Sequence, residues 1–312
     1  MGGSSGSFGR AGSGRTAADY ASKLREEAEA TSREFETELT QEFSELLVDF
    51  NARNTEETAE RLEDVKRLLS DSLDLDTSFE TLFGGSVAKH TYVDGISDVD
   101  AMLVVKGQLE AATPKEVLAK VAAVLSEKLG KECTVSVGNV ALTLKYAKGP
   151  EIQLVPSIRD GNVLRVPAWE KNSWSQIDPK QFRDGLTKRN NECGGKLIPT
   201  LKLAKAINAT LPENARLSGY HIESLGVAAF RDYKDERTTV RMLPHLFKQA
   251  SELVKQPMAD RTGQSVHVDS YLGEANSTQR MAASHLLARI HQRMLNASAA
   301  KSRDLWRDLF DV

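Results

Sequence analysis

Apolar and polar residues follow one another along this 312-residue chain with two different periods, which divide it into helical and extended stretches. Between residues 17 and 73 apolar side chains recur every three or four positions, as expected of helices with one buried face. The members of this stripe are Phe35, Leu39, Phe43, Leu46, Leu47 and Phe50. Residues 51–54 interrupt the pattern, and Thr55-Glu56-Glu57 has the composition of a helix N-terminus. The pattern therefore predicts two consecutive helices.

The middle of the chain has the pattern of a sheet. A helix is predicted from Pro114 to Lys128, and short apolar runs at 134–137, 140–146 and 152–155 predict strands. The last two runs are expected to form a hairpin beside an earlier apolar strand at 101–105. Residues 157–176 are predicted to be a loop, in which tryptophans such as Trp174 fix the chain to the core.

Helical periodicity returns after residue 177 and continues almost to the last residue. Helices are predicted at 197–208, at two positions within 223–250 and at 277–299, with an apolar anchor at 305–310. Residues 1–16 are rich in Gly and Ser and are predicted to form a flexible lead. We thus expect an α+β protein with a sheet-bearing region at 17–176 and a helical region at 177–312.

Composition narrows the classes of function. The net charge of −3 offers no general basic field for nucleic acid, although local basic patches remain compatible with it. Two cysteines, Cys133 and Cys193, are too few for a disulfide scaffold and lack metal-site spacing, which favours a reducing cytoplasm. No apolar stretch approaches the ~20 residues of a membrane span. We expect a soluble cytoplasmic protein with no membrane partner.

The candidate chemistry is concentrated between residues 84 and 100. Gly84-Gly85-Ser86 combines a backbone that permits close approach with a hydroxyl and exposed N–H groups, which suit phosphate oxygens. Asp98 and Asp100 flank one residue at the start of a strand, so both side chains point to the same face. Two adjacent carboxylates are unfavourable unless a cation lies between them, and Mg²⁺ or Mn²⁺ fits oxygen ligands. Together these features predict metal-assisted nucleotidyl transfer.

The spacing of Gly84-Gly85-Ser86 and Ser97-Asp98-Val99-Asp100 resembles the signature of the polymerase-β-like nucleotidyltransferase superfamily. Thr91, together with Ser97-Asp98, makes the chain most similar to the cGAS/DncV-like branch, the CD-NTases. The resemblance covers nearly the whole chain from about residue 17. It implies a bilobal fold, in which a catalytic core with a long N-terminal helix occupies 17–176 and a C-terminal helical domain at 177–312 closes the nucleotide cleft.

A two-metal site needs a third carboxylate, and the resemblance places it on the strand that ends at Pro156. Gln153 occupies the position where many relatives have an acid, and Glu151 lies two residues earlier on the same strand face. We predict that Glu151 holds the metals together with Asp98 and Asp100, and that Gln153 lines the nucleotide site. The alternative, that Glu151 is a surface charge on an edge strand, stays open.

The resemblance also implies nucleotide contacts in the C-terminal region. Lys202 and Lys205, three residues apart on a predicted helix, are placed to reach a triphosphate. The run from Ser218 to Glu223 resembles a family motif in which the serine contacts the terminal phosphates and the tyrosine stacks on a base. Carried over, these roles fall to Ser218 and Tyr220. In the catalytic core, Ser86 and the backbone near Gly85 are expected to hold the β and γ phosphates of the donor.

The implied reaction is the synthesis of a cyclic di- or trinucleotide second messenger from NTPs, ATP among them, with two divalent ions. The implied setting is bacterial antiphage signalling (CBASS), in which the product activates a separate effector. Two alternatives remain: a nucleotidyltransferase that modifies an RNA, a protein or a small molecule, and a catalytically impaired nucleotide sensor, which Gln153 suggests. The sequence leaves open the bases, the linkage, regulatory protein partners and a nucleic-acid activator.

Overall fold

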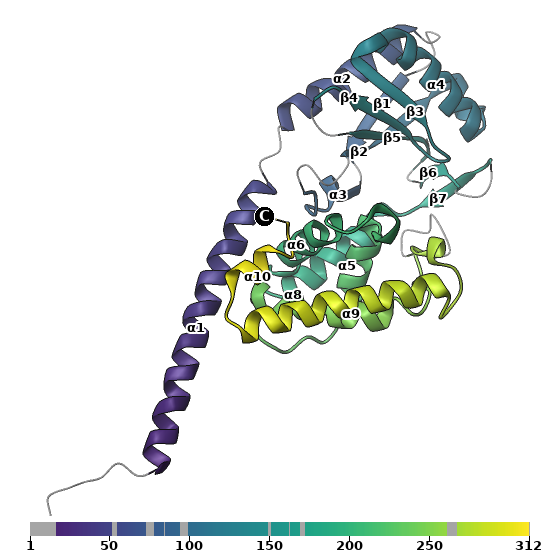
Figure 1. Ribbon diagram of the computed structural model, residues 1–312. Helices are drawn as coiled ribbons and strands as arrows, with labels where there is room; N and C mark the ends of the chain where they lie inside the picture. Colours follow the sequence, from purple (N-terminus) through teal and green to yellow (C-terminus); the bar gives the residue numbers. More distant parts are fainter. Residues whose placement is uncertain are drawn as a thin grey trace, which may run out of the picture.

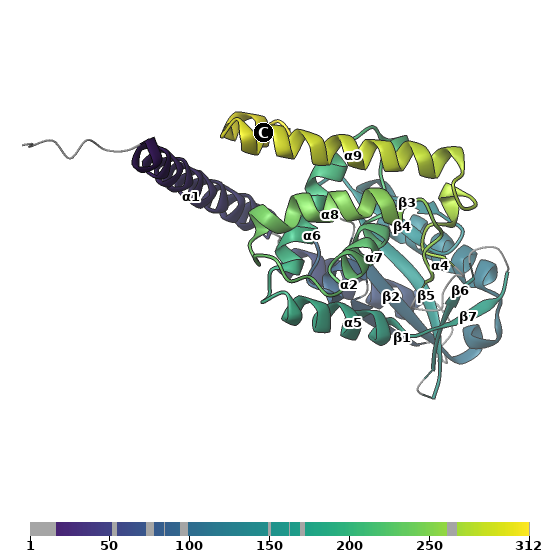
Figure 2. The same ribbon diagram turned by 90° about the horizontal axis from the view of Figure 1, so that it is seen from below.

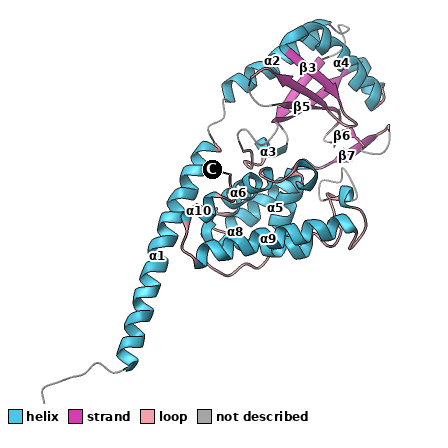
Figure 3. Cartoon of the chain, viewed as in Figure 1, coloured by secondary structure: helices cyan, strands magenta, loops and turns pink. Residues whose placement is uncertain are grey.

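The chain forms two lobes, one built around a sheet with helices packed on it and one made of helices, which meet across one junction (Figures 1 and 3). The computed structural model describes residues 17–51, 55–72, 78–83, 85–93, 99–148, 151–161, 163–168, 172–260 and 267–311. We call residues 55–177 the sheet lobe, and we call α1 together with residues 179–311 the helical lobe. The α+β, bilobal architecture agrees with the fold predicted from the sequence.

Helices and strands alternate in the first part of the sheet lobe, and consecutive strands follow. They are α2 (Thr55–Ser72), β1 (Ser78–Phe83), α3 (Gly85–Ala88), β2 (Val99–Lys106), α4 (Pro114–Leu129), β3 (Cys133–Val137), β4 (Leu142–Tyr146), β5 (Ile152–Asp160), β6 (Val163–Pro167) and β7 (Trp174–Ile177). The helical lobe contains α1 (Ala17–Asp49), α5 (Pro179–Glu192), α6 (Leu197–Ala209), α7 (Gly219–Ala229), α8 (Thr239–Leu253), α9 (Thr278–Ala299) and α10 (Arg303–Arg307). Short 3₁₀ turns lie at 107–111, 130–132, 213–215 and 270–272.

One mixed sheet contains the seven strands of the described residues. Its main order is β1-β2-β5-β4-β3, while β6 pairs with β5 and β7 pairs with β6. The pairing of β2 with β5 is parallel and every other pairing is antiparallel. The hairpin predicted beside the strand at 101–105 is therefore confirmed as β4 and β5, next to β2.

Helices α2 and α4 cover one face of this sheet. Ala101 and Leu103 of β2 and Leu154 of β5 are buried there, in one apolar cluster with α2 and α4. The start of α4 is fixed by a capping box between Thr113 and Glu116, with Pro114 in the first turn. Because side chains alternate along a strand, the residues next to this buried row point to the opposite face, toward the helical lobe.

The prediction of a loop at 157–176 is wrong. Strand β5 continues to Asp160, and β6 and β7 extend it into two further hairpins. Asp160 pairs with Val163, so only residues 161 and 162 connect the two strands, and Gly161 has φ +58°. Asp160-Gly161 is a hairpin signal, but the strands beyond it are short and depend on non-local pairing. The Trp174 indole N–H donates to the carbonyl of Ala112 (3.0 Å), as expected of a residue that fixes the chain to the core.

Helix α1 lies along the helical lobe and extends past it (Figures 1 and 2). Its buried side chains Phe35, Leu39 and Phe43 belong to the apolar core of the helical lobe. Phe43 packs edge-on against Trp306, with ring centroids 5.4 Å apart, so the predicted C-terminal anchor is confirmed. The two N-terminal helices thus serve different lobes, because the buried residues of α2 pack on the sheet.

None of the helices in the described part of the chain is both long enough and apolar enough to cross a membrane.

Candidate functional site

The sheet face opposite α2 and α4 presents the polar ends of three adjacent strands. Asp100 of β2 is the parallel partner of Gln153 of β5, and Gln153 is in turn the antiparallel partner of Thr143 of β4. Partners in register point to the same face, so these three side chains form one polar row. Asp98, the other predicted metal ligand on this strand, lies in 94–98, outside the described residues.

Glu151, the predicted third acid, directly precedes β5 and lies two residues before Gln153. It therefore belongs to the same face as Asp100. Its carboxylate forms an ion pair with Lys145 of β4 (2.5 Å), and the Glu151 side chain is 35% exposed. Among the residues that the structure describes, no three His, Cys, Asp or Glu side chains are grouped as a metal site. Because Asp98 is outside that set, the three-carboxylate site stays a prediction.

Ser86 lies in the first turn of the short helix α3, beside Gly85. Its side chain is buried, and within the described residues its Oγ has no hydrogen-bond partner. A buried hydroxyl without a partner is unfavourable, so the position suits an oxygen-bearing ligand. The carbonyl of Ser86 accepts a hydrogen bond from the backbone N–H of Thr91 (2.9 Å), which closes the turn.

Lys205 of α6 extends from the helical lobe to this turn. Its ammonium group donates to the carbonyl of Thr91 (3.0 Å), the hydroxyl of Thr91 (3.3 Å) and a carboxylate oxygen of Glu223 (2.7 Å). Burial lowers the pKa of Lys205, while Glu223 and, more weakly, Asp100 oppose this shift. Lys205 therefore lies within the field of Asp100, but its three donors have protein acceptors, and its contact with a phosphate stays a prediction.

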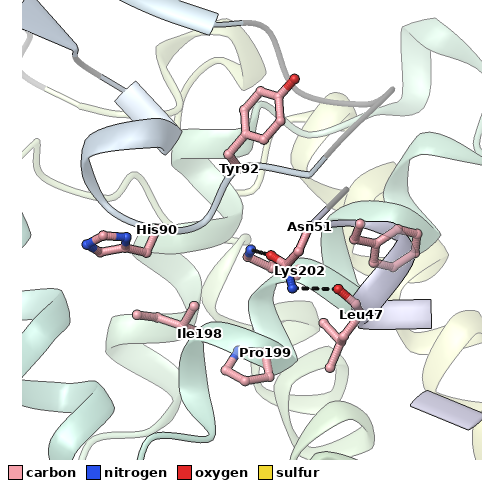
Figure 4. A pocket seen from close by; sticks show the side chains of 8 residues that line it. Leu47, Asn51, His90, Tyr92, Ile198, Pro199 and Lys202 are labelled. Atoms are coloured by element: carbon pink, nitrogen blue, oxygen red, sulfur yellow. Dashed lines mark hydrogen bonds between the residues drawn. The ribbon is translucent and has the colours of Figure 1, made fainter. Parts of the chain in front are cut away.

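Lys202, one turn earlier on α6, points into a separate cavity of about 370 Å³ at the junction of the lobes (Figure 4). Its ammonium group donates to the side-chain oxygen of Asn51, just past the end of α1. His90 and Tyr92 line the cavity from the sheet lobe, and the other lining residues are Leu47, Phe50, Ile198 and Pro199. The structure thus separates the two lysines, and the predicted phosphate contact of Lys202 also stays a prediction.

Ser218 and Tyr220 lie at the start of α7. Ser218 caps the helix, with its Oγ accepting from the N–H of His221 (3.2 Å), and its side chain is exposed. Ser218 also contacts Tyr271, whose hydroxyl accepts from the Ser218 backbone N–H (3.1 Å) and is hydrogen-bonded to the Ser218 side chain. A Cβ placed at Gly219 would lie 3.5 Å from the Lys205 Nζ, so the N-terminus of α7 adjoins this lysine. Helix N-termini attract anions because their N–H groups are unpaired.

The ring of Tyr220 is partly enclosed by its neighbours. It packs edge-on against Phe182 (4.8 Å between centroids), and the Lys89 ammonium lies 5.0 Å from its centroid. Its hydroxyl donates to Asp260 (2.8 Å).

His221 is fully buried, with its Nδ1 2.9 Å from the Tyr271 hydroxyl and its Nε2 3.4 Å from Asp269. This agrees with a packing role for His221, whereas stacking of a base on Tyr220 stays a prediction.

Sequence reasoning missed the acid at the centre of this junction, Glu223 of α7. Its buried carboxylate accepts hydrogen bonds from Lys205, from the hydroxyl of Thr91 (2.5 Å) and from Lys89. Although burial by itself raises the pKa of Glu223, Lys89 and Lys205 lower it to about 2. The signal was a glutamate among the apolar residues of 222–230, because buried carboxylates are rare unless paired.

Comparison with known proteins adds a family and a fold. Residues 38–190 match the family model of the Second Messenger Oligonucleotide or Dinucleotide Synthetase (SMODS) domain. No curated protein sequence matches the chain.

Several solved structures share the fold over most of their length. The Bradyrhizobium diazoefficiens CD-NTase CdnG in complex with GTP superposes with a TM-score of 0.67, 14% identity and coverage of 86% of this chain and 92% of that one. The E. coli MS115-1 CdnC:HORMA-deltaN complex superposes with a TM-score of 0.62 and 14% identity, and the match covers 82% of this chain and 90% of that one. The Vibrio cholerae DncV cyclic AMP-GMP synthase superposes with a TM-score of 0.60 and 14% identity, and the match covers 94% of this chain and 88% of that one. At this identity the likeness establishes the fold alone.

Proposed function

We propose that the chain, whose residues 38–190 match the SMODS domain model and whose fold is that of CD-NTases, is a nucleotidyltransferase that joins NTPs into a cyclic di- or trinucleotide. The observation that carries the proposal is the convergence at the lobe junction. Helix α3 carries Ser86, whose hydroxyl has no partner among the described residues, and it packs against both β2, the strand of Asp100, and α7, whose N-terminus adjoins Lys205. An acidic face beside a group of phosphate-binding elements is what transfer of a nucleotidyl group requires.

The donor triphosphate lies between the two lobes in this proposal. The Ser86 hydroxyl and the N–H groups near Gly85 donate to its β and γ phosphates. Ser218 contacts the terminal phosphates from the opposite side, where Lys205 and Lys202 add positive charge. Tyr220 lies against a base, and Gln153 lines the site beside Asp100. These groups hold the triphosphate in one orientation, which is the main protein contribution to this class of reaction.

The donor set on the sheet suits a hard divalent cation. Asp100 and Glu151 are carboxylates on one face of neighbouring strands, and oxygen ligands of this kind bind Mg²⁺ or Mn²⁺. We propose that these two residues and Asp98 hold two ions. When bound, such ions lower the pKa of the attacking ribose hydroxyl and neutralise charge on the leaving pyrophosphate.

The test is an incubation with the four radiolabelled NTPs and Mg²⁺ or Mn²⁺, followed by phosphatase, chromatography and mass analysis. We expect a phosphatase-resistant product of cyclic oligonucleotide mass. The double variant Asp98→Asn/Asp100→Asn should form none, while Asp160→Asn, on the exposed hairpin, should act as the wild type. Product from the double variant, or label that appears only on an added RNA or protein acceptor, would refute the proposal.

A second function, nucleotide sensing without catalysis, is supported by Gln153. The strand position paired with Asp100 carries an amide instead of a carboxylate. A sensor would bind NTP with metal and release no pyrophosphate. A pyrophosphate-release assay therefore separates the two functions, because the synthase releases one pyrophosphate for each bond formed.

The setting we propose is antiphage signalling, in which the cyclic product activates a separate effector. The neighbouring structures include a GTP complex and a complex with a HORMA protein. By analogy, we propose NTP substrates with ATP among them, and a regulatory protein that binds the chain. We place the reaction in the cytoplasm, where NTPs are abundant; both cysteines are unpaired, as expected of a reducing compartment.

A further inference from the structure

Thr91 is held by hydrogen bonds through each of its polar groups. Its backbone N–H donates to the carbonyl of Ser86 (2.9 Å), and its own carbonyl accepts from Lys205 (3.0 Å). Its hydroxyl donates to Glu223 (2.5 Å). Ser86 and Thr91 belong to the sheet lobe, whereas Lys205 and Glu223 belong to the helical lobe. A continuous set of hydrogen bonds therefore runs from α7 to the turn that carries Ser86.

The backbone of this turn is strained at its centre. His90 has φ +59°, a left-handed conformation that costs a non-glycine residue about 1 kcal/mol. Such a conformation persists where its surroundings determine the chain on both sides. The two residues that flank His90 are Lys89 and Thr91, and both donate to the Glu223 carboxylate. One buried acid of the helical lobe thus fixes both ends of the strained residue in the other lobe.

We propose that Glu223 is a positioning residue for the phosphate-binding turn. Through Thr91 and Lys89 it holds the Ser86 hydroxyl where a phosphate oxygen can reach it. The triphosphate affinity of the sheet lobe then depends on docking of the helical lobe, and by linkage a bound triphosphate strengthens that docking. This inference rests on the proposed function, because it acts through the phosphate contact of Ser86.

Thr91 offers a milder test than Glu223, whose replacement also leaves buried ammonium groups without a counter-charge. Thr91→Val removes only the hydroxyl at nearly constant shape, while Thr91→Ser keeps it and serves as the matched control. The measurement is the calorimetric Kd of α,β-methylene ATP and GTP analogues with Mg²⁺, with circular dichroism to verify folding. We expect Thr91→Val to weaken binding of the preferred analogue about tenfold, as for loss of one hydrogen bond to a charged group. Thr91→Ser should stay within about twofold of the wild type, because it keeps the hydroxyl that makes this bond.

A double-mutant cycle with Ser86→Ala tests whether Thr91 acts through Ser86. If it does, Thr91→Val/Ser86→Ala binds as weakly as Ser86→Ala alone, because the positioned hydroxyl is already absent. Additive losses, or a Thr91→Val variant that binds like the wild type, would overturn the inference and leave the proposed function intact. A Ser86→Ala variant with wild-type affinity would instead refute the phosphate contact itself, and the positioning role with it.

Discussion

Replacing Glu223 by glutamine should destabilise the protein by about 3 kcal/mol at neutral pH, because removing one partner of a buried ion pair costs several kcal/mol. The substitution keeps the shape and an acceptor for Thr91, but it removes the charge. Lys205, whose side chain is 5% exposed, then has no carboxylate at its ammonium group, and Lys89 loses the same partner. An uncompensated charge in a buried site is the source of the loss.

The pKa of Glu223 gives a second route to the magnitude. It is lowered from 4.5 to about 2 in the folded protein. A difference of this size corresponds to roughly 3 kcal/mol, since each pKa unit is worth about 1.4 kcal/mol. The folded pKa is the lower one, so this contribution is present above pH 4.5 and is lost as the pH falls toward 2. The two routes agree, and the second adds a pH signature.

The assay is urea unfolding of the wild type and Glu223→Gln at pH 7 and pH 4. The difference in unfolding free energy should shrink by about 1 kcal/mol at pH 4, because the unfolded wild type takes up a proton that the folded protein does not. Glu252→Gln is the control, since Glu252 forms an exposed ion pair with Lys255 and should change stability by under about 1 kcal/mol. A Glu223→Gln loss no larger than the control, or one that is independent of pH, would refute the reasoning.

Two further predictions concern a buried histidine and the third acid. Burial lowers the pKa of His221 to about 4, against the opposing effect of Asp269. Burying the neutral ring therefore costs nothing above pH 6.5, and the unfolding free energy should fall by about 2 kcal/mol between pH 7 and pH 5. In urea unfolding, His221→Gln should make the unfolding free energy less dependent on pH over this range. An unchanged pH dependence would contradict the assignment. Glu151→Gln should abolish cyclic product in the NTP assay while shifting stability by less than about 1 kcal/mol, because its pair with Lys145 is exposed. Full activity in that variant would make Glu151 a surface charge.

The helices were predictable from the sequence because their apolar period extends over many turns. The apolar anchor at Trp306 was found in the same way, and the structure confirms it. The two predicted N-terminal helices are also confirmed, since α1 ends at Asp49 and α2 begins at Thr55. The hairpins of β6 and β7 were missed because each strand has only four or five residues. Such strands are determined by their partners in the sheet more than by their own composition.

The residues of the candidate site also differ in whether local sequence indicates them or distant partners determine them. Ser86, Asp100 and Ser218 could be proposed as site residues from local motifs, and their elements α3, β2 and α7 pack together because α3 contacts both of the others. The role of Glu223 could not be assigned, because its partner Lys89 is 134 residues away and no local pattern links them. The separation of Lys202 from Lys205 was equally hidden, since it depends on Asn51, 151 residues from Lys202.

Because α1 packs in the helical lobe and α2 packs on the sheet, the helical lobe is discontinuous in sequence. Its core needs Phe43 near one end of the chain and Trp306 near the other, with the whole sheet lobe inserted between them. During synthesis, α1 is made before its packing partners α6 and α8, which follow the whole sheet lobe. Its apolar stripe stays exposed until α6, which begins at Leu197, has been made. During that time such a surface is prone to aggregate or to be bound by a chaperone. The sheet lobe, one uninterrupted segment, can fold during that interval.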